Sequence, residues 1–242
     1  SEAVITGVNI GDFGRKSNDG NLFNLLKNID DKSTINRFRI SSIEPNLLTE
    51  DIIKFINHSD SFLPHFHIPL QSGNDKILKL MKRKYNLKMY QEKIEMIKKT
   101  IPDACIGADV IVGFPGETSE DFESTFNYIS KLNINYLHVF SYSNRTGTVA
   151  SELINQVPKT EKINRSRSLN RLSNHMRLDF YKKNINTVRK VLFESKIDDN
   201  YVVGFTDNYI RVVVKGNIKM LKKIYNVKLS FIGDDKVYGE LY

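Results

Sequence analysis

The sequence predicts an α/β domain built from βα units, followed by a long basic helix and a small all-β barrel. Up to about Tyr142, short runs rich in β-branched and aromatic residues alternate with segments of helical periodicity, which is typical of a parallel sheet. From Lys159 the chain changes to one continuous helix-forming segment rich in Lys and Arg. After this helix, short strand-like runs are separated by turns that contain Asp, Asn and Gly. We therefore divide the chain into residues 1–158, 159–187 and 188–242.

The first part is expected to contain strands that alternate with helices. The expected strands are residues 3–8, 37–42, 65–70, 105–114 and 136–142. The expected helices are about residues 21–29, 49–57, 74–83, 87–100 and 119–132. Thr49 and Thr118 precede two of these helices, and carboxylates follow each of them in the first turn, as is typical of a helix N-cap.

The long helix carries an apolar stripe and most of the positive charge. Leu169, Leu172, Met176 and Phe180 recur at spacings of three and four residues, so one face of the helix should pack against another surface. Residues 159–190 contain ten Lys or Arg and two acidic residues, a local charge that equals the formal net charge of +8 of the whole chain. This distribution favours a polyanionic partner, although a solvated helix face would give the same pattern.

Composition restricts the class of protein further. With 40% hydrophobic residues the chain can bury a sizeable core, and no apolar run approaches the ~20 residues that span a bilayer, so we expect no membrane partner. The single cysteine, Cys105, cannot form an internal disulfide and cannot by itself hold a metal ion. A reducing, cytoplasmic setting is therefore expected, without a metal site; the sequence does not indicate an oligomeric state.

Each expected strand of the first part is followed by a polar or glycine-containing turn. These turns are residues 6–14, 41–46, 69–75, 113–118 and 141–148. Because ligands of parallel βα domains bind at the carboxyl ends of the strands, five such turns should surround one pocket. In the turn GFPGET, Gly113 and Gly116 would let backbone approach a ligand, Pro115 would stiffen the bend, and Glu117 would present a carboxylate at the rim. Taken alone, this turn could be an ordinary βα connection.

Histidines and one arginine near these strands allow more than one interpretation. His65 and His67 should point to the same face, as in a two-histidine metal pair, but without a third ligand nearby a core or supporting role is favoured. His138 is interpreted as a core or pocket-wall residue. Arg145 lies on a loop at the pocket edge and is suited to bind a carboxylate or a phosphate.

The basic helix and the expected barrel together indicate an RNA-binding surface. Cationic side chains neutralise phosphates, and aromatic side chains stack on unpaired bases. The residues expected to contact RNA are Arg165, Arg167, Arg171, Phe205, Tyr209 and Arg211.

Several motifs together resemble the radical S-adenosylmethionine methylthiotransferases. They are RFRISSIEPN (37–46), HIPLQSGNDKILKLMKRKY (67–85), GADVIVGFPGETSEDF (107–122), LHVFSYSNRTGT (137–148) and VVGFTDNYIRV (202–212). TGVNIGDFG and GFTDNY are most similar to the branch that adds a methylthio group to C2 of N6-threonylcarbamoyladenosine 37 of tRNA. The resemblance covers nearly the whole chain. It implies a radical-SAM (βα) partial barrel that binds S-adenosylmethionine, followed by a small RNA-binding β-barrel called TRAM.

The resemblance also implies which residues hold the cofactor. Ile111, Gly113 and Glu117 would belong to the strand element beside the adenine, while Asp109 stands where the broader superfamily pattern often has glycine. The residues implied near the ribose, the amino-acid end and the neighbouring rim are Arg39, Ser41, Ser42, Glu44, Gln71, Ser72 and Gly73. Arg145 would lie in the last of these loops, where Thr146 replaces the usual proline.

The family's first strand, whose loop carries CxxxCxxC for a 4Fe–4S cluster, has no counterpart in this sequence. With five expected strands where the family has six, the chain resembles a C-terminal piece of a longer enzyme, lacking its first strand, and the missing N-terminal part would be its partner. In this family an electron from that cluster cleaves S-adenosylmethionine to start the reaction. We therefore expect this chain alone to be inactive.

Two other functions agree with the same residues. The chain could act as a non-catalytic RNA-binding protein, or the methylthiotransferase could modify a ribosomal protein instead of a tRNA. The basic helix and the aromatic-bearing tail favour tRNA.

Overall fold

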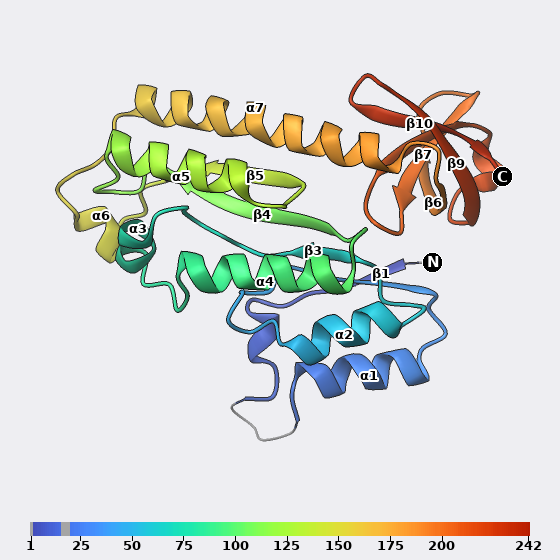
Figure 1. Ribbon diagram of the computed structural model, residues 1–242, viewed down its shortest axis with the longest axis horizontal. Coiled ribbons are helices and arrows are strands. Elements are labelled where there is room, and N and C mark those ends of the chain that lie inside the picture. The colour runs from blue at the N-terminus through green and yellow to red at the C-terminus, as the bar shows by residue number, and fades with distance from the viewer. Residues whose placement is uncertain (1, 16–19) are drawn as a thin grey trace.

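The computed structural model describes residues 2–15 and 20–242, and it contains a parallel sheet, a long helix and a β-barrel (Figure 1). Within these residues the first part has five strands, as predicted, in a two-stranded and a three-stranded parallel ladder that one bridge joins into a single layer. They are β1 (Glu2–Ile5), β2 (Arg37–Ile40), β3 (His65–His67), β4 (Cys105–Val112) and β5 (Tyr136–Ser141). β1 pairs with β2 and β3–β5 pair in order, while a bridge between Phe38 and Phe62 links the two groups. Because all pairs are parallel, the carboxyl ends of the strands share one end of the sheet.

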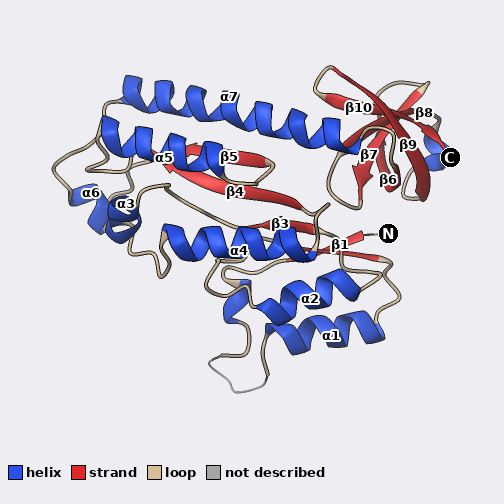
Figure 2. Ribbon diagram, in the orientation of Figure 1, coloured by secondary structure: helices blue, strands red, loops and turns tan. Residues whose placement is uncertain are grey.

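Helices follow the strands at the predicted places. They are α1 (Leu22–Lys32), α2 (Glu50–His58), α3 (Asp75–Leu80), α4 (Leu87–Thr100) and α5 (Ser119–Lys131). Figure 2 shows α1 and α2 below the strands, α4 below β4, and α5 at the height of β5. Both predicted N-caps are confirmed. Thr49 accepts a hydrogen bond from Ile52 N at 3.3 Å, and Thr118 forms a reciprocal capping box with Asp121.

The two faces of the sheet differ in polarity. In β4, Ile106, Ala108, Val110 and Val112 are fully buried in the core that the helices cover. The alternate residues of the strand lie on the opposite, inner face, where Asp109 is only partly buried. The two-residue period of a strand therefore separates an apolar core from a polar inner face.

One long helix connects the sheet to the barrel. A short helix, α6 (Val149–Glu152), precedes α7, which spans Lys159–Asn184 and ends three residues before the predicted boundary. Leu169, Leu172 and Met176 pack on the core of the sheet, and Phe180 belongs to the core of the barrel. The predicted stripe is thus shared between two cores. Across residues 2–15 and 20–242, no helix is both long enough and apolar enough to cross a bilayer.

α7 also covers the edge of the sheet at β5. Ser173 Oγ accepts a hydrogen bond from Leu137 N at 2.8 Å and donates one to Leu137 O at 3.2 Å. Edge strands expose backbone groups that can pair with another chain. At this edge a helix side chain satisfies both backbone groups of Leu137.

The tail forms a small closed barrel, which confirms the second half of the predicted fold. Its strands are β6 (Val188–Lys196), β7 (Tyr201–Thr206), β8 (Arg211–Lys215), β9 (Ile224–Gly233) and β10 (Lys236–Leu241), in the order β10-β8-β7-β6-β9. Only the β8–β10 pairing is parallel among these pairs. Its core includes the fully buried Val191, Phe193 and Val227.

Two buried arginines of β2 attach the barrel to the sheet. Both guanidinium groups bind Glu2 of β1, with Nε–O distances of 2.8 Å for Arg37 and for Arg39. Their remaining N–H groups donate to backbone carbonyls of the barrel, among them Thr206 O, at 3.2 Å from Arg37 and 2.7 Å from Arg39. We call Glu2, Arg37 and Arg39 the arginine clamp.

Glu2→Gln should destabilise the chain by about 3 kcal/mol, because it leaves two buried guanidinium groups without their anion. Urea denaturation followed by circular dichroism measures the loss. The matched control is Glu50→Gln, which removes an exposed pair with Lys54 at 2.7 Å and should cost much less, because solvent screens exposed ion pairs. Equal losses for the two variants would contradict the assigned role of the clamp.

Candidate cofactor-binding site

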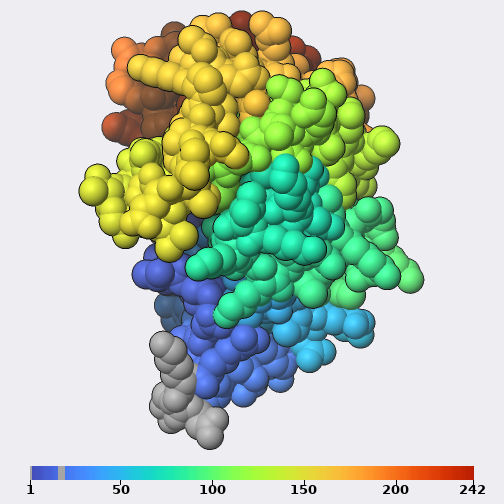
Figure 3. Space-filling model, turned by 90° about the vertical axis from the view of Figure 1, so that its left-hand side faces the viewer, coloured from blue at the N-terminus to red at the C-terminus, as the bar shows by residue number. Residues whose placement is uncertain are grey.

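The turns that follow the strands lie side by side at the carboxyl end of the sheet. Backbone hydrogen bonds join neighbouring turns and strands: Ser41 N to Ile5 O (2.9 Å), Ile43 N to His67 O (3.0 Å) and Tyr142 N to Val112 O (2.9 Å). Figure 3 faces this end of the molecule, where the segment before α7 (yellow) lies beside the α3 region (teal). The five predicted turns therefore share one end of the sheet, and the barrel lies at the other end (Figure 1).

The turn of residues 113–118 closes around the carboxylate of Glu117. Its Oε2 accepts hydrogen bonds from the backbone N–H groups of Gly113 and Phe114, and lies 3.4 Å from Nη1 of Arg165 on α7. Burial raises the pKa of Glu117, and the Arg165 charge and the two N–H groups oppose this shift. We expected this carboxylate at the rim. The structure turns it inward, because its three donors lie on the interior side of the turn.

Gly113 and Gly116 have φ angles of 71° and 86°, which are strained for residues that carry a Cβ. At Gly113 a Cβ would clash with Cγ of Lys162, so α7 packs directly on the backbone of the turn. The two glycines thus let the chain reverse and let α7 approach it.

The residues after β2 lie in different surroundings. The Arg39 guanidinium faces Glu2 and the barrel, where Asp207 O accepts from it at 3.0 Å, rather than the turns at the carboxyl end. Ser41 and Ser42 line a cavity of about 480 Å³ between the inner face of the sheet and the barrel. Glu44 lies 3.3 Å from Nη1 of Arg83 and is partly exposed.

Gln71, Ser72 and Gly73 form a tight turn against α5. Gln71 has a φ angle of 66°, and Ser72 Oγ is buried 3.3 Å from Thr125 Oγ1. A Cβ on Gly73 would lie 2.8 Å from the Thr125 Cα. Gly73 is therefore required for the approach of α5, and Gln71 is turned away from regular strand geometry.

Several polar atoms at this end are available to a ligand. Ser41 Oγ, Asn46 Oδ1 and Gln71 Oε1 are buried and have no hydrogen-bond partner among the residues that the structure describes. Buried polar groups in proteins are nearly always bonded, so these atoms fit a polar ligand such as S-adenosylmethionine. The half-buried Ile111 lines a neighbouring groove of about 320 Å³, and Arg145 is exposed on the adjoining loop.

The same end provides no ligand set for a 4Fe–4S cluster. Such clusters are held by cysteine thiolates, and the only cysteine of the sequence is Cys105. Cys105 lies at the amino end of β4, packed with residues of the barrel core, and burial raises its pKa to about 12. The residues of this chain therefore do not fit that cofactor.

Two residues expected to contact RNA face the sheet instead. The Tyr209 ring stacks on His65 at 3.9 Å and on Phe205 at 4.9 Å, and Arg39 lies over it at 5.0 Å. Tyr209 has a φ angle of 68°, which aims its side chain from the β7–β8 turn toward the sheet. Phe205 and Tyr209 thus form the barrel side of the 480 Å³ cavity.

The predicted RNA-binding arginines also separate into two groups. Arg165 is buried between Glu117 and Glu161, so its guanidinium is not presented to an outside phosphate. Arg167, Arg171 and Arg211 are exposed.

A stacked aromatic pair on the barrel surface, in which Phe231 is exposed and Tyr238 partly buried, was not predicted. Phe231 and Tyr238 face each other on β9 and β10, with their rings 4.9 Å apart and nearly parallel. Phe231 is 58% exposed, although it belongs to a barrel strand. The ion pair of Arg177 with Asp235 at 3.7 Å brings this hairpin against α7. Alternate residues of β9 point inward and outward, so the sequence would have predicted an outward Phe231 if it showed which residues of the strand face the barrel interior.

Comparison with known proteins places these features in context. A sequence profile described as the Radical SAM superfamily matches residues 13–129. Over 237 residues the chain is 39% identical to the threonylcarbamoyladenosine tRNA methylthiotransferase MtaB of Bacillus subtilis (strain 168), covering 96% of this chain and 52% of the relative. It is 34% identical over 232 residues to the tRNA-2-methylthio-N(6)-dimethylallyladenosine synthase of Carboxydothermus hydrogenoformans, covering 95% and 53%. The chain thus spans about half the length of the curated relatives it matches.

Among solved structures, the archaeal Methanocaldococcus infernus Elp3 with an N-terminal deletion superposes with a TM-score of 0.51. The sequence identity is 13%, and the superposition covers 98% of this chain and 77% of the other. At this identity the likeness concerns the fold alone.

Glu117→Gln should destabilise the chain by about 2–3 kcal/mol, because Arg165 then loses its buried anion and keeps only the partly exposed Glu161. Urea denaturation measures this, with Glu123→Gln on the exposed side of α5, the helix that follows the turn, as the matched control. The control should lie within about 0.5 kcal/mol of the unchanged protein. Coincident unfolding curves for both variants would show that Glu117 does not hold the turn.

Proposed function

Because the chain belongs to the radical S-adenosylmethionine methylthiotransferase family, we propose that it is the cofactor- and RNA-binding part of a tRNA methylthiotransferase. In this proposal the complete enzyme adds a methylthio group to C2 of N6-threonylcarbamoyladenosine 37. The single observation that carries it is the 39% identity to the Bacillus subtilis relative over 96% of this chain.

The turns at the carboxyl end of the sheet would hold S-adenosylmethionine, which supplies the methyl group of the product when bound. Ser41 Oγ and Gln71 Oε1 would offer it hydrogen bonds, and Ile111 an apolar contact. The exposed Arg145 is suited to a carboxylate. Gly113 and Glu117 would act through the shape of their turn, since α7 and Arg165 occupy their interior side.

The iron–sulfur cluster would come from a part of the enzyme outside this chain. The chain has one cysteine, which is buried at the end of the sheet opposite the turns. We infer that these residues alone do not support catalysis and that a segment carrying CxxxCxxC would be required.

tRNA would be held by the barrel and the exposed side of α7. Arg167 and Arg171 supply cations there, and the stacked Phe231 and Tyr238 supply an aromatic surface beside the same helix. Cations on phosphates and aromatics on unpaired bases are the usual combination in single-stranded RNA binding.

A second candidate is RNA binding without catalysis, which the single buried cysteine favours.

Within the family, relatives named for threonylcarbamoyladenosine and for dimethylallyladenosine both match this chain. The 39% and 34% identities favour the threonylcarbamoyl branch.

After anaerobic reconstitution, this chain should carry almost no acid-labile sulfide, whereas a version extended upstream through a CxxxCxxC loop should carry about four sulfides per site. Nucleoside analysis of tRNA treated with the extended version should show methylthiolated threonylcarbamoyladenosine. Methylthiolated product from the present chain alone would overturn the inferred division of labour. Methylthiolated dimethylallyladenosine instead would assign the other branch.

Replacing Arg167 and Arg171 by Gln should weaken binding of an anticodon stem–loop RNA and lower the slope of log affinity against log salt by about 0.7–0.9 for each phosphate that is no longer neutralised. Fluorescence anisotropy at several salt concentrations measures both quantities. Lys88→Gln, which removes an exposed charge on α4, is the control and should leave the slope unchanged. An unchanged slope for the arginine variant would place RNA elsewhere.

A further inference from the structure

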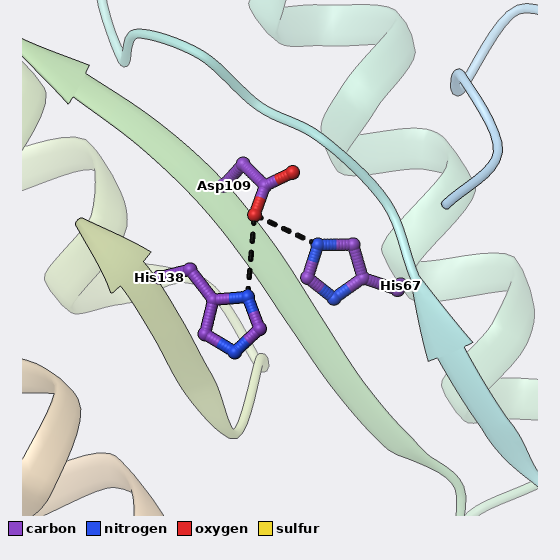
Figure 4. Close-up of side chains that lie close together, drawn as sticks. All are labelled: His67, Asp109 and His138. Carbon is purple, nitrogen blue, oxygen red and sulfur yellow. Dashed lines mark hydrogen bonds and ion pairs between the residues drawn. The ribbon is translucent and has the colours of Figure 1, made fainter. Parts of the chain in front are cut away.

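The inner face of the sheet gathers polar side chains from three neighbouring strands. His67 lies on β3, Asp109 on β4 and His138 on β5, and Asp109 is directly opposite His138 in the parallel register. Since alternate residues of a strand share a face, the three side chains project to the same side. Figure 4 shows the two imidazole rings directed at the carboxylate between them.

The distances within this group suit a common ligand. Asp109 Oδ1 lies 2.9 Å from His67 Nε2 and 3.4 Å from His138 Nδ1, and one ligand atom from each residue lies within 4.8 Å of the others. Two ligand atoms bound tetrahedrally at 2.0–2.1 Å from one zinc ion are about 3.4 Å apart. Small side-chain movements would therefore place a cation at the centre of the three atoms.

We propose that His67, Asp109 and His138 form a binding site for a divalent first-row transition-metal cation such as Zn²⁺ or Fe²⁺. Two imidazoles and one carboxylate are a common ligand set for these ions, and they leave a coordination position free. The sequence offered only the pair His65 and His67, which lacked a third ligand. The structure excludes His65 from the group and adds residues from two other strands.

The orientation of His67 is already fixed as it would be in a metal site. Tyr136 Oη lies 3.3 Å from His67 Nδ1, so the ring is held with Nε2 directed at Asp109. Tyr136 Oη also lies 2.9 Å from His65 Nε2, which holds the tyrosine in place. Partners of this kind, bound to the second nitrogen of a ligating histidine, orient the ligand and are a regular feature of metal sites.

The surroundings favour a cation and give it access. The three residues line the 480 Å³ cavity between the sheet and the barrel, and the side chain of His138 is 54% exposed. Carboxylates of Glu2 and Glu194 also line this cavity. Among the lining residues the permanent positive charge is that of Arg39, and Glu2 already pairs with its guanidinium. The cavity is therefore a poor receptor for a phosphate and a better one for a metal ion.

The test is anaerobic titration of the complete chain, free of any histidine tag, with Co²⁺ and with Zn²⁺. Co²⁺ should produce visible ligand-field bands that saturate at one equivalent, and Zn²⁺ should displace it. His138→Ala and Asp109→Asn should each weaken binding at least tenfold. The matched control is His58→Ala, which removes an exposed imidazole on α2 and should change the affinity less than twofold.

Circular dichroism establishes that each variant is folded, and His138→Ala is decisive because its half-exposed side chain is removable without opening the core. Saturable binding that His138→Ala weakens and His58→Ala does not would support the site. Absence of saturable binding to the unchanged chain would overturn the proposal. So would equal affinities of the unchanged chain and His138→Ala, which would leave the group as a hydrogen-bonded cluster only.

Discussion

A buried guanidinium group must find anions or carbonyl oxygens for its donors, and this requirement decides how the sheet and the barrel meet. Burial lowers the pKa of Arg37, and the carboxylate of Glu2 opposes this shift. The clamp uses both oxygens of Glu2, and the remaining donors of both arginines reach backbone carbonyls of the barrel. If the barrel separated from the sheet, the arginine donors would lose their carbonyl acceptors. The cavity between sheet and barrel therefore has walls in fixed positions.

The two-residue alternation of the strands has a second effect. It sends Ile106, Ala108 and Val110 of β4 into the core and Asp109 to the other side. One strand thus supplies both the apolar residues of the core and the polar residues of the inner face. A polar inner face is tolerated because it borders a cavity, where water or a ligand can satisfy it.

The local features of this fold were predictable from the sequence, and the contacts between distant segments were not. Strand and helix positions follow from periodicity, and the caps at Thr49 and Thr118 involve neighbouring residues only. The roles of Arg39 and Arg165 depend on anions 37 and 48 residues away in the chain, Glu2 and Glu117. A count of charges shows them as cations for outside partners, whereas the folded chain uses both internally.

Register and backbone conformation account for the other differences between prediction and structure. Asp109 meets His138 only because β4 and β5 pair in one of several possible registers. Tyr209 faces the sheet because its residue adopts a left-handed conformation in the β7–β8 turn. Residue types alone predict neither the β4–β5 register nor the backbone conformation of Tyr209, because both depend on contacts with segments distant in the sequence.

The packing of α7 on two cores sets a condition on its length. The helix has 26 residues, and at about 1.5 Å per residue it spans roughly 39 Å between the turn at Gly113 and the barrel. Each residue of an α-helix also turns the chain by about 100°. Insertion or deletion of one residue would rotate the barrel about the helix axis relative to the sheet, and Glu117 and the clamp could not both keep their partners. A whole added turn would restore that orientation but would move the barrel by about 5.4 Å along the axis. α7 thus sets both the rotation and the spacing between the two ends of the molecule, and a change in its length in either direction separates the clamp from its carbonyl partners.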